Sequence, residues 1–171
     1  MKDFSKKIEF TANIAIIVIA LLLGVVLVER YFFSNSPKSQ TFNNRIKKDE
    51  IISLPIDWTK REITLLLILS TNCHFCSESG PFYKRLTEEL QNQGTVQVIA
   101  ILPQDISESH QYLNKLGVSV SEIRQEPLPI KGVSGTPTLI LTDNTGKVIN
   151  FWVGKLPPKR ENEVINQIKS L

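Results

Sequence analysis

The sequence is poor in the two residues that most often build cross-links and metal centres, with 2 cysteines and 2 histidines among 171 residues. Two cysteines are too few for the disulfide framework of a small secreted scaffold. The histidines, His74 and His110, add too few ligands to complete a tetrahedral metal site. The chain also lacks a large excess of charge of one sign. Its net charge is +3, and from Arg45 onward it has 15 lysines and arginines and 14 aspartates and glutamates. This balance argues against a nucleic-acid binder, which carries a basic stripe.

What the chain does have is one long apolar run, Phe10 to Val28, interrupted only by Thr11 and Asn13. A helix of about 19 residues spans roughly 28 Å, enough to cross the hydrocarbon core of a bilayer. A cleaved signal peptide is one alternative, but the run ends in charged and aromatic residues rather than in small ones. A buried core helix is the other, although every face of the run is apolar. We predict an uncleaved transmembrane signal anchor at residues 10–28.

The flanks of this run set the expected orientation and the domain boundaries. Three lysines precede the run and few basic residues follow it closely, so residues 1–9 are expected in the cytoplasm and the remainder outside. Residues 29–49 contain a polar stretch without periodicity, which indicates a linker. Residues 50–171 then form one domain on the extracytoplasmic side, periplasmic or equivalent, of a single-pass protein of the cell membrane.

Hydrophobic patterning in this domain alternates between strands and helices. Short continuous apolar runs predict buried strands, helical spacing predicts helices, and Asp143 to Gly146 predicts a hairpin turn. The expected strands are 63–69, 96–102, 138–142 and 147–153, and the expected helices are 81–92, 107–116 and 158–171. The pattern predicts an α/β domain with a mixed central β-sheet flanked by helices.

Both cysteines lie in the segment Ser70 to Phe82, directly after the first predicted strand. Cys73 is expected at the mouth of the following helix, and Cys76 one turn inside it. Unpartnered N–H groups of a first helical turn and the helix dipole favour a thiolate at Cys73. One cysteine can then attack a disulfide, and the other can release the mixed species. A redox-active pair is therefore favoured over a structural disulfide, which would close too short a loop to restrict the unfolded chain much.

Beyond the cysteine spacing, residues 50–171 resemble the thioredoxin superfamily. Pro81 lies five residues after the second cysteine, where thioredoxin-like proteins carry the proline that kinks their active-site helix. The segment Gly135–Ile149 resembles the one that holds the family's cis-proline, which implies a cis bond between Thr136 and Pro137 facing the disulfide. The resemblance implies a thioredoxin-like fold. With its N-terminal anchor, the chain is most similar to the membrane-tethered TlpA/ResA-like branch.

The sequence departs from the family's pattern around the cysteines. Leu67 stands where many thioredoxins have a buried aspartate, and Ser79 stands where some tethered reductases have a glutamate. The neighbouring Glu78 is a candidate for handling the proton of the second cysteine. His74 and Phe75 separate the cysteines in place of the family's better-known pairs. A cationic histidine between them would stabilise the thiolate and make the pair more oxidising.

The resemblance implies a thiol–disulfide oxidoreductase whose redox group is the dithiol itself, with no metal or organic cofactor. The residues expected to carry the function are the nucleophile Cys73, the resolving thiol Cys76, the substrate contacts Thr136, Pro137, His74 and Phe75, and Pro81, which shapes the active-site helix. The expected partners are exported protein thiols or disulfides, a membrane electron-transfer partner, and the bilayer. We expect no nucleic-acid partner and a monomeric chain.

The direction of electron flow stays open at this point. Similarity to the TlpA/ResA-like branch implies reduction of disulfides in exported proteins such as apocytochromes. Oxidation of exported thiols, with recharging by a quinone-linked membrane partner, is the main alternative. A third hypothesis is a non-catalytic binding module that keeps the thioredoxin fold and merely presents its surface to a partner.

Overall fold

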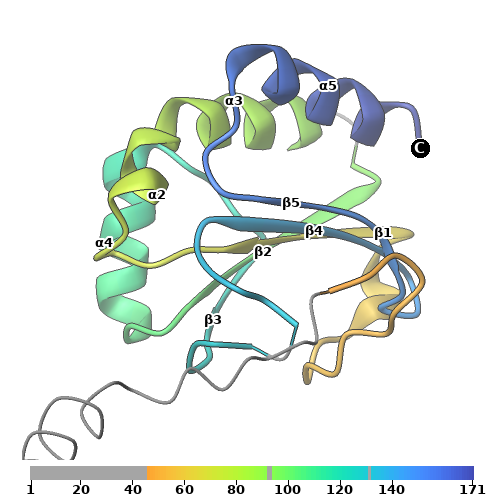
Figure 1. Ribbon diagram of the computed structural model, residues 1–171. Helices are drawn as coiled ribbons and strands as arrows, with labels where there is room; N and C mark the ends of the chain where they lie inside the picture. Colours follow the sequence, from red (N-terminus) through yellow and green to blue (C-terminus); the bar gives the residue numbers. More distant parts are fainter. Residues whose placement is uncertain (1–45, 92–93, 131) are drawn as a thin grey trace, which may run out of the picture. The chain divides into compact units, whose positions relative to one another are not determined.

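The computed structural model describes residues 46–91, 94–130 and 132–171 (Figure 1). Its elements in chain order are the 3₁₀ turn η2 (Trp58–Lys60), β1 (Ile63–Ile68), α2 (His74–Glu78), α3 (Gly80–Gln91), β2 (Val96–Leu102), α4 (Ile106–Leu116), β3 (Glu122–Gln125), β4 (Thr138–Asp143), β5 (Val148–Val153) and α5 (Pro158–Lys169). Every strand and helix predicted from the sequence is present, with bounds shifted by no more than one or two residues.

The strands form one mixed sheet in the order β3-β2-β1-β4-β5. β1 pairs in parallel with β2 and antiparallel with β4. β2 also pairs in parallel with β3, and β4 and β5 form an antiparallel hairpin. The central position of β1 explains why it is apolar except at Thr64, because both faces of such a strand are covered. The predicted α/β class with a mixed sheet is confirmed.

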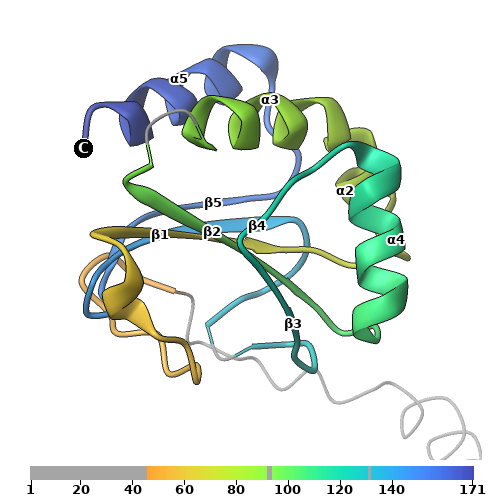
Figure 2. The same ribbon diagram turned by 180° about the vertical axis from the view of Figure 1, so that it is seen from behind.

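Side chains of β1 and the residue after it alternate between two hydrophobic cores. Leu65, Leu67 and Leu69 belong to the main core, which also contains apolar residues of α3, α4 and α5. Helices α3 and α5 lie side by side over this face of the sheet (Figures 1 and 2). Leu66 and Ile68 belong to a second core, which is covered by the loop segments that precede β1 and β4. The sheet therefore holds the end of β1 rigidly between two packed layers.

Strand β3 is the element that sequence patterning does not reveal. It is four residues long, it alternates charged and apolar side chains only briefly, and it lies at the edge of the sheet (Figure 2). Its residues pair with the C-terminal half of β2. An edge strand can be short and charged because one side faces solvent, which leaves little hydrophobic pattern to detect.

The predicted turn between β4 and β5 is confirmed. The side chain of Asp143 accepts hydrogen bonds from the N–H groups of Thr145 and Lys147 at 2.8 and 3.1 Å. Gly146 has φ of +79°, and a Cβ at this position would lie 2.7 Å from the indole ring of Trp58. Glycine is therefore required here both for the left-handed backbone and for the close packing of the ring.

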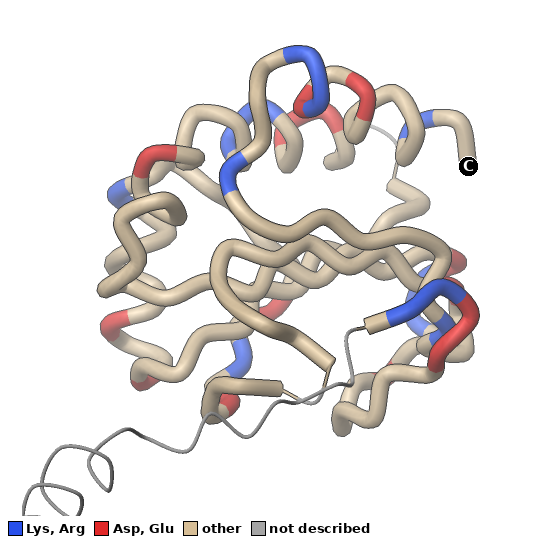
Figure 3. Tube along the Cα trace, viewed as in Figure 1, with Lys and Arg blue, Asp and Glu red and all other residues tan. Residues whose placement is uncertain are grey.

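Charged residues of both signs are interspersed over the helices and loops (Figure 3). Between α3 and α5, Arg85 pairs with Glu161 at 3.1 Å, and Glu89 pairs with Lys169 at 2.6 Å. Solvent-exposed ion pairs of this kind stabilise a fold only slightly. The two helices are held against the sheet mainly by their apolar faces.

The predicted anchor at residues 10–28 lies outside the described residues, as does most of the predicted linker at 29–49. Among the residues that the structure does describe, no helix is both long enough and apolar enough to cross a bilayer. The anchor, its orientation and the linker therefore remain predictions from the sequence.

Candidate active site

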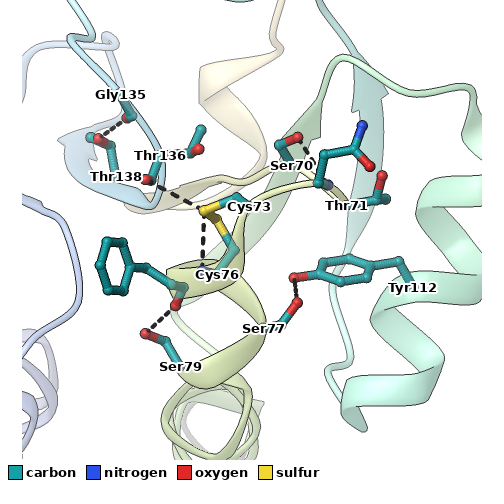
Figure 4. Close-up of a disulfide and its surroundings, with 12 residues drawn as sticks. Ser70, Thr71, Cys73, Cys76, Ser77, Ser79, Tyr112, Gly135, Thr136 and Thr138 are labelled. Atoms are coloured by element: carbon teal, nitrogen blue, oxygen red, sulfur yellow. Dashed lines mark hydrogen bonds between the residues drawn. A yellow bond between two sulfur atoms is a disulfide. The ribbon is translucent and has the colours of Figure 1, made fainter.

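Strand β1 carries the chain directly to the cysteine pair. Beyond it, the turn Ser70–Asn72 leads to Cys73, whose N–H donates to the carbonyl of Ser70 at 3.1 Å. Cys73 has an extended backbone and caps the N-terminus of α2. Its sulfur accepts a hydrogen bond from the N–H of Cys76 at 3.1 Å (Figure 4). The start of the helix thus points a backbone donor at the sulfur of Cys73, as the sequence predicted.

Cys73 and Cys76 form a disulfide, with their Cα atoms 5.2 Å apart. The two sulfurs have different surroundings. Cys76 is 0% exposed and belongs to the main hydrophobic core, whereas Cys73 is only partly buried and packs against the margin of that core. An incoming sulfur atom can therefore reach Cys73 more easily than Cys76. The division into an attacking Cys73 and a resolving Cys76 stays a prediction, and this asymmetry is the geometry that such a division needs.

The helix that follows the cysteines is interrupted. α2 ends at Glu78 and is capped by Ser79, whose N–H and hydroxyl both donate to the carbonyl of Phe75, at 3.1 and 2.8 Å. α3 begins at Gly80, with Pro81 as its second residue. Pro81 has no N–H to continue the helical ladder, and the break lies beside it, where the family resemblance implies a kink. Gly80 suits the junction because a Cβ there would come within 2.8 Å of a leucine side chain on α4.

The segment before β4 lies against the disulfide. The bond between Thr136 and Pro137 is cis, as predicted from the family resemblance. The sulfur of Cys73 lies 3.5 Å from the carbonyl oxygen of Thr136 (Figure 4). In the disulfide this sulfur carries no hydrogen, so the approach is a contact; after reduction, a Cys73 thiol can donate to the same oxygen. The N–H of Gly154, just after β5, donates to the carbonyl of Pro137 at 2.7 Å and anchors the segment.

The two residues between the cysteines are exposed, and the first belongs to a charged cluster. His74 lies 3.1 Å from one carboxylate oxygen of Glu78, and Lys155 lies 3.0 Å from the other. The hydrogen bond from Lys155, helped by the charges of Lys155 and His74, lowers the pKa of the Glu78 carboxyl despite some desolvation. Both oxygens of Glu78 are engaged with basic side chains, so this geometry lends no support to a proton-handling role for Glu78 at Cys76.

Phe75, which is 54% exposed, lines an apolar groove together with Gly154, Lys155, Leu156 and Pro157. The groove adjoins the disulfide, because Phe75 is two residues from the first cysteine and Gly154 is hydrogen-bonded to the cis-proline segment. Sequence reasoning identified Phe75 but missed the opposite wall. No local pattern marks residues 154–157, because they come beside Phe75 only when β5 pairs with β4.

The described residues contain no cluster of three or more histidine, cysteine, aspartate or glutamate side chains that could hold a metal ion. The redox group that the structure contains is the Cys73–Cys76 disulfide itself. A disulfide accepts two electrons from a dithiol by thiol–disulfide exchange, a reaction that needs no cofactor.

The sequence matches no family model and no curated protein. Solved structures do resemble the chain. One is from Chlorobium tepidum and is described as a thiol:disulfide interchange protein DsbE, with 23% identity over 67% of this chain and 82% of that one, at a TM-score of 0.55. Another is a DsbF homologue from Corynebacterium diphtheriae, with 21% identity over 66% and 74% of the two chains, at a TM-score of 0.53.

A third similar structure is the thioredoxin domain of a thiol-disulfide oxidoreductase from Bacteroides vulgatus, with 13% identity over 66% of this chain and 81% of that one, at a TM-score of 0.50. At such identities the likeness establishes the fold, which is thioredoxin-like. Within that fold, a Cys-x-x-Cys disulfide caps a helix and faces a cis-proline. Fold and disulfide together define the class of protein as a thiol–disulfide oxidoreductase.

Proposed function

We propose that the protein is a membrane-tethered, extracytoplasmic enzyme that exchanges disulfides with exported proteins, with Cys73 as the nucleophile and Cys76 as the resolving thiol. The observation that carries this proposal is the unequal burial of two bonded sulfurs at one site. Cys76 is 0% exposed, whereas Cys73 is only partly buried and lies beside the carbonyl of Thr136. Tethering rests on the apolar run at residues 10–28 and on the three lysines that precede it.

In the reducing direction, the Cys73 thiolate attacks one sulfur of a substrate disulfide. A mixed disulfide forms, and the other substrate sulfur leaves as a thiolate. The thiolate of Cys76 then attacks the sulfur of Cys73, which forms the enzyme disulfide and releases the second substrate thiol. Two electrons pass from the dithiol to the substrate, and a membrane electron-transfer partner must supply two more for the next turnover. Oxidation of a substrate dithiol follows the same steps in reverse.

We favour reduction of disulfides in exported proteins, apocytochromes among them, as the direction of flow. The resemblance to the TlpA/ResA-like branch supports it, and so does the ion pair of Lys155 with Glu78. Uncompensated positive charge would stabilise the thiolate and make the pair more oxidising. Oxidation of exported thiols is the second candidate, with a quinone-linked membrane partner that recharges the disulfide. His74 directly follows Cys73 in the chain, and a cationic histidine there would stabilise the thiolate.

Substrate contacts are proposed on both sides of the disulfide. Thr136 and Pro137 would flank the substrate chain on one side, and His74 and Phe75 would flank it on the other. The apolar groove beside Phe75 suits an apolar side chain next to the substrate cysteine, because such a residue must lie within a few ångströms of the mixed disulfide. No nucleic-acid partner is proposed, and a monomer is sufficient for this chemistry.

The decisive experiment is a trap with Cys76→Ser in the full-length protein in its membrane. This variant can form a mixed disulfide through Cys73 but cannot resolve it, so covalent adducts with exported proteins should accumulate and can be identified by mass spectrometry. Cys73→Ser is the matched control and should capture none. Failure of Cys76→Ser to trap any protein would contradict the catalytic assignment and favour a non-catalytic binding module.

The reduction potential of the Cys73–Cys76 pair would then decide the direction. A value near that of thioredoxin, roughly −270 mV, supports the reductase, whereas a value above about −150 mV would overturn it in favour of the oxidant. Equilibration of the full-length protein with glutathione or dithiothreitol buffers, followed by quantification of free thiols, measures this potential directly.

A further inference from the structure

Helix α4 presents a row of polar side chains to the active-site turn. Glu108 and Tyr112 are four residues apart in α4, which places them on one side of the helix, and Gln104 lies just before the N-cap residue Asp105. Tyr112 is hydrogen-bonded to Ser77 of α2 at 3.2 Å (Figure 4). The hydroxyl of Thr71 donates to the carboxylate of Glu108 at 2.7 Å. The row therefore contacts the chain both before and after Cys73.

Gln104 holds the turn itself. Its side-chain oxygen accepts the N–H of Thr71 at 3.3 Å, and its side-chain nitrogen donates to the hydroxyl of Ser70 at 3.2 Å. The backbone of Gln104 is fixed in turn, because its carbonyl accepts a hydrogen bond from the hydroxyl of Ser109 in α4 at 3.4 Å. One side-chain amide thus joins two consecutive residues of the turn to the start of the helix.

The held residues are the ones that set the position of Cys73. The carbonyl of Ser70 accepts the N–H of Cys73 at 3.1 Å, and the sulfur of Cys73 is 3.1 Å from the N–H of Cys76. The strength of a hydrogen bond falls steeply with poor geometry. A shift of the turn would therefore move the sulfur away from the donor that stabilises its charged form.

We propose that Gln104 is a positioning residue for the nucleophile: it clamps the turn Ser70–Thr71 to α4 and so keeps the sulfur of Cys73 aligned with the N–H of Cys76. This inference rests on the proposed role of Cys73 as the attacking thiolate. Gln104 itself touches neither sulfur in the contacts described above. It acts through the turn, and its loss should change the ionisation of Cys73 rather than remove a reacting group.

The test compares Gln104→Leu with the unmodified sequence as reduced full-length protein in detergent. The rate of alkylation of Cys73 by iodoacetamide is measured across pH, with the modified residue located by peptide mass spectrometry. Gln104→Leu should react roughly threefold to tenfold more slowly near neutral pH, because fewer Cys73 groups are ionised. At alkaline pH, where the thiol is ionised in both proteins, the two rates should converge.

Gln125→Leu is the matched control, since Gln125 donates to the carbonyl of Pro103, next to Gln104, without contacting the turn. Its pH profile should stay within about twofold of the unmodified protein. Ser70→Ala provides a second variant if Gln104→Leu does not fold, because it removes the hydroxyl to which Gln104 donates and leaves the bond from Thr71 in place. Suppose that Cys73 of the unmodified protein reacts at lower pH than a free thiol. If the pH profile of Gln104→Leu or Ser70→Ala then coincides with that of the unmodified protein, this inference alone is overturned. An unmodified protein whose Cys73 titrates like a free thiol would overturn the proposed function as well.

Discussion

The unequal surroundings of the two sulfurs lead to a quantitative prediction for the reduced protein. The sulfur of Cys73 is 3.1 Å from the N–H of Cys76, and a hydrogen bond to a charged group contributes about 1.5–3 kcal/mol. Since about 1.4 kcal/mol corresponds to a factor of ten in an ionisation constant, Cys73 should ionise at least roughly tenfold more readily than a free cysteine. Cys76, at 0% exposure in an apolar core, should ionise less readily, because desolvation disfavours its thiolate.

The assay is alkylation of the reduced full-length protein with iodoacetamide between about pH 5 and pH 9, with each cysteine followed separately by mass spectrometry. Because the pKa of the Cys73 thiol should lie below that of a free thiol, its reactivity should persist at acidic pH and decline only as pH falls through that lowered value. At neutral pH Cys73 should react more than tenfold faster than Cys76. Equal rates, or a profile for Cys73 that matches a free cysteine peptide, would refute this account of the site.

Two further predictions concern stability and substrate binding. Gly146→Ala should lower the free energy of unfolding by about 2–3 kcal/mol in urea titrations, because a side chain strains the left-handed backbone and meets the ring of Trp58. Gly94→Ala has the same backbone cost but open space around its Cβ, so it should lose only about 1 kcal/mol, and equal losses would contradict the packing argument. Phe75→Ala should raise KM about fivefold with little change in kcat, as expected for about 1 kcal/mol of lost apolar contact. Ile51→Ala, another exposed apolar residue, is its control, and an unchanged KM in Phe75→Ala would exclude the groove as a substrate contact.

The fold could be predicted from the sequence wherever burial leaves a continuous or periodic pattern. The central strands β1 and β2 are apolar over nearly their whole length because both faces of the sheet are covered. The redox pair could be located because its geometry is local: Cys73 and Cys76 are three residues apart and directly follow a buried strand. The cis bond at Thr136–Pro137 was predicted instead from the resemblance to a family, since no hydrophobic pattern indicates the isomer of a peptide bond.

The features that could not be predicted from the sequence depend on tertiary contacts, which no local pattern encodes. β3 escaped prediction because an edge strand of four residues needs little apolar surface. Gln104 is separated by more than thirty residues from the turn that it holds, and a glutamine after a strand is ordinarily a loop residue. Lys155 likewise reaches Glu78 only through the pairing of β4 with β5. Neither Gln104 nor Lys155 belongs to a sequence motif, so the role proposed for Gln104 emerges only from the structure.

The surroundings of Cys76 affect the rate of disulfide exchange, whereas the surroundings of Cys73 affect the direction of electron flow. Leu67 belongs to the same buried core as Cys76 and supplies neither charge nor proton acceptor. The thiolate of Cys76 must form whether it attacks the mixed disulfide or leaves the enzyme disulfide, so its burial slows both directions alike. The potential instead follows the stability of the reduced pair, and a more stable Cys73 thiolate makes a stronger oxidant. Because Lys155 pairs with Glu78, its positive charge is partly compensated, which supports the proposed direction of reduction.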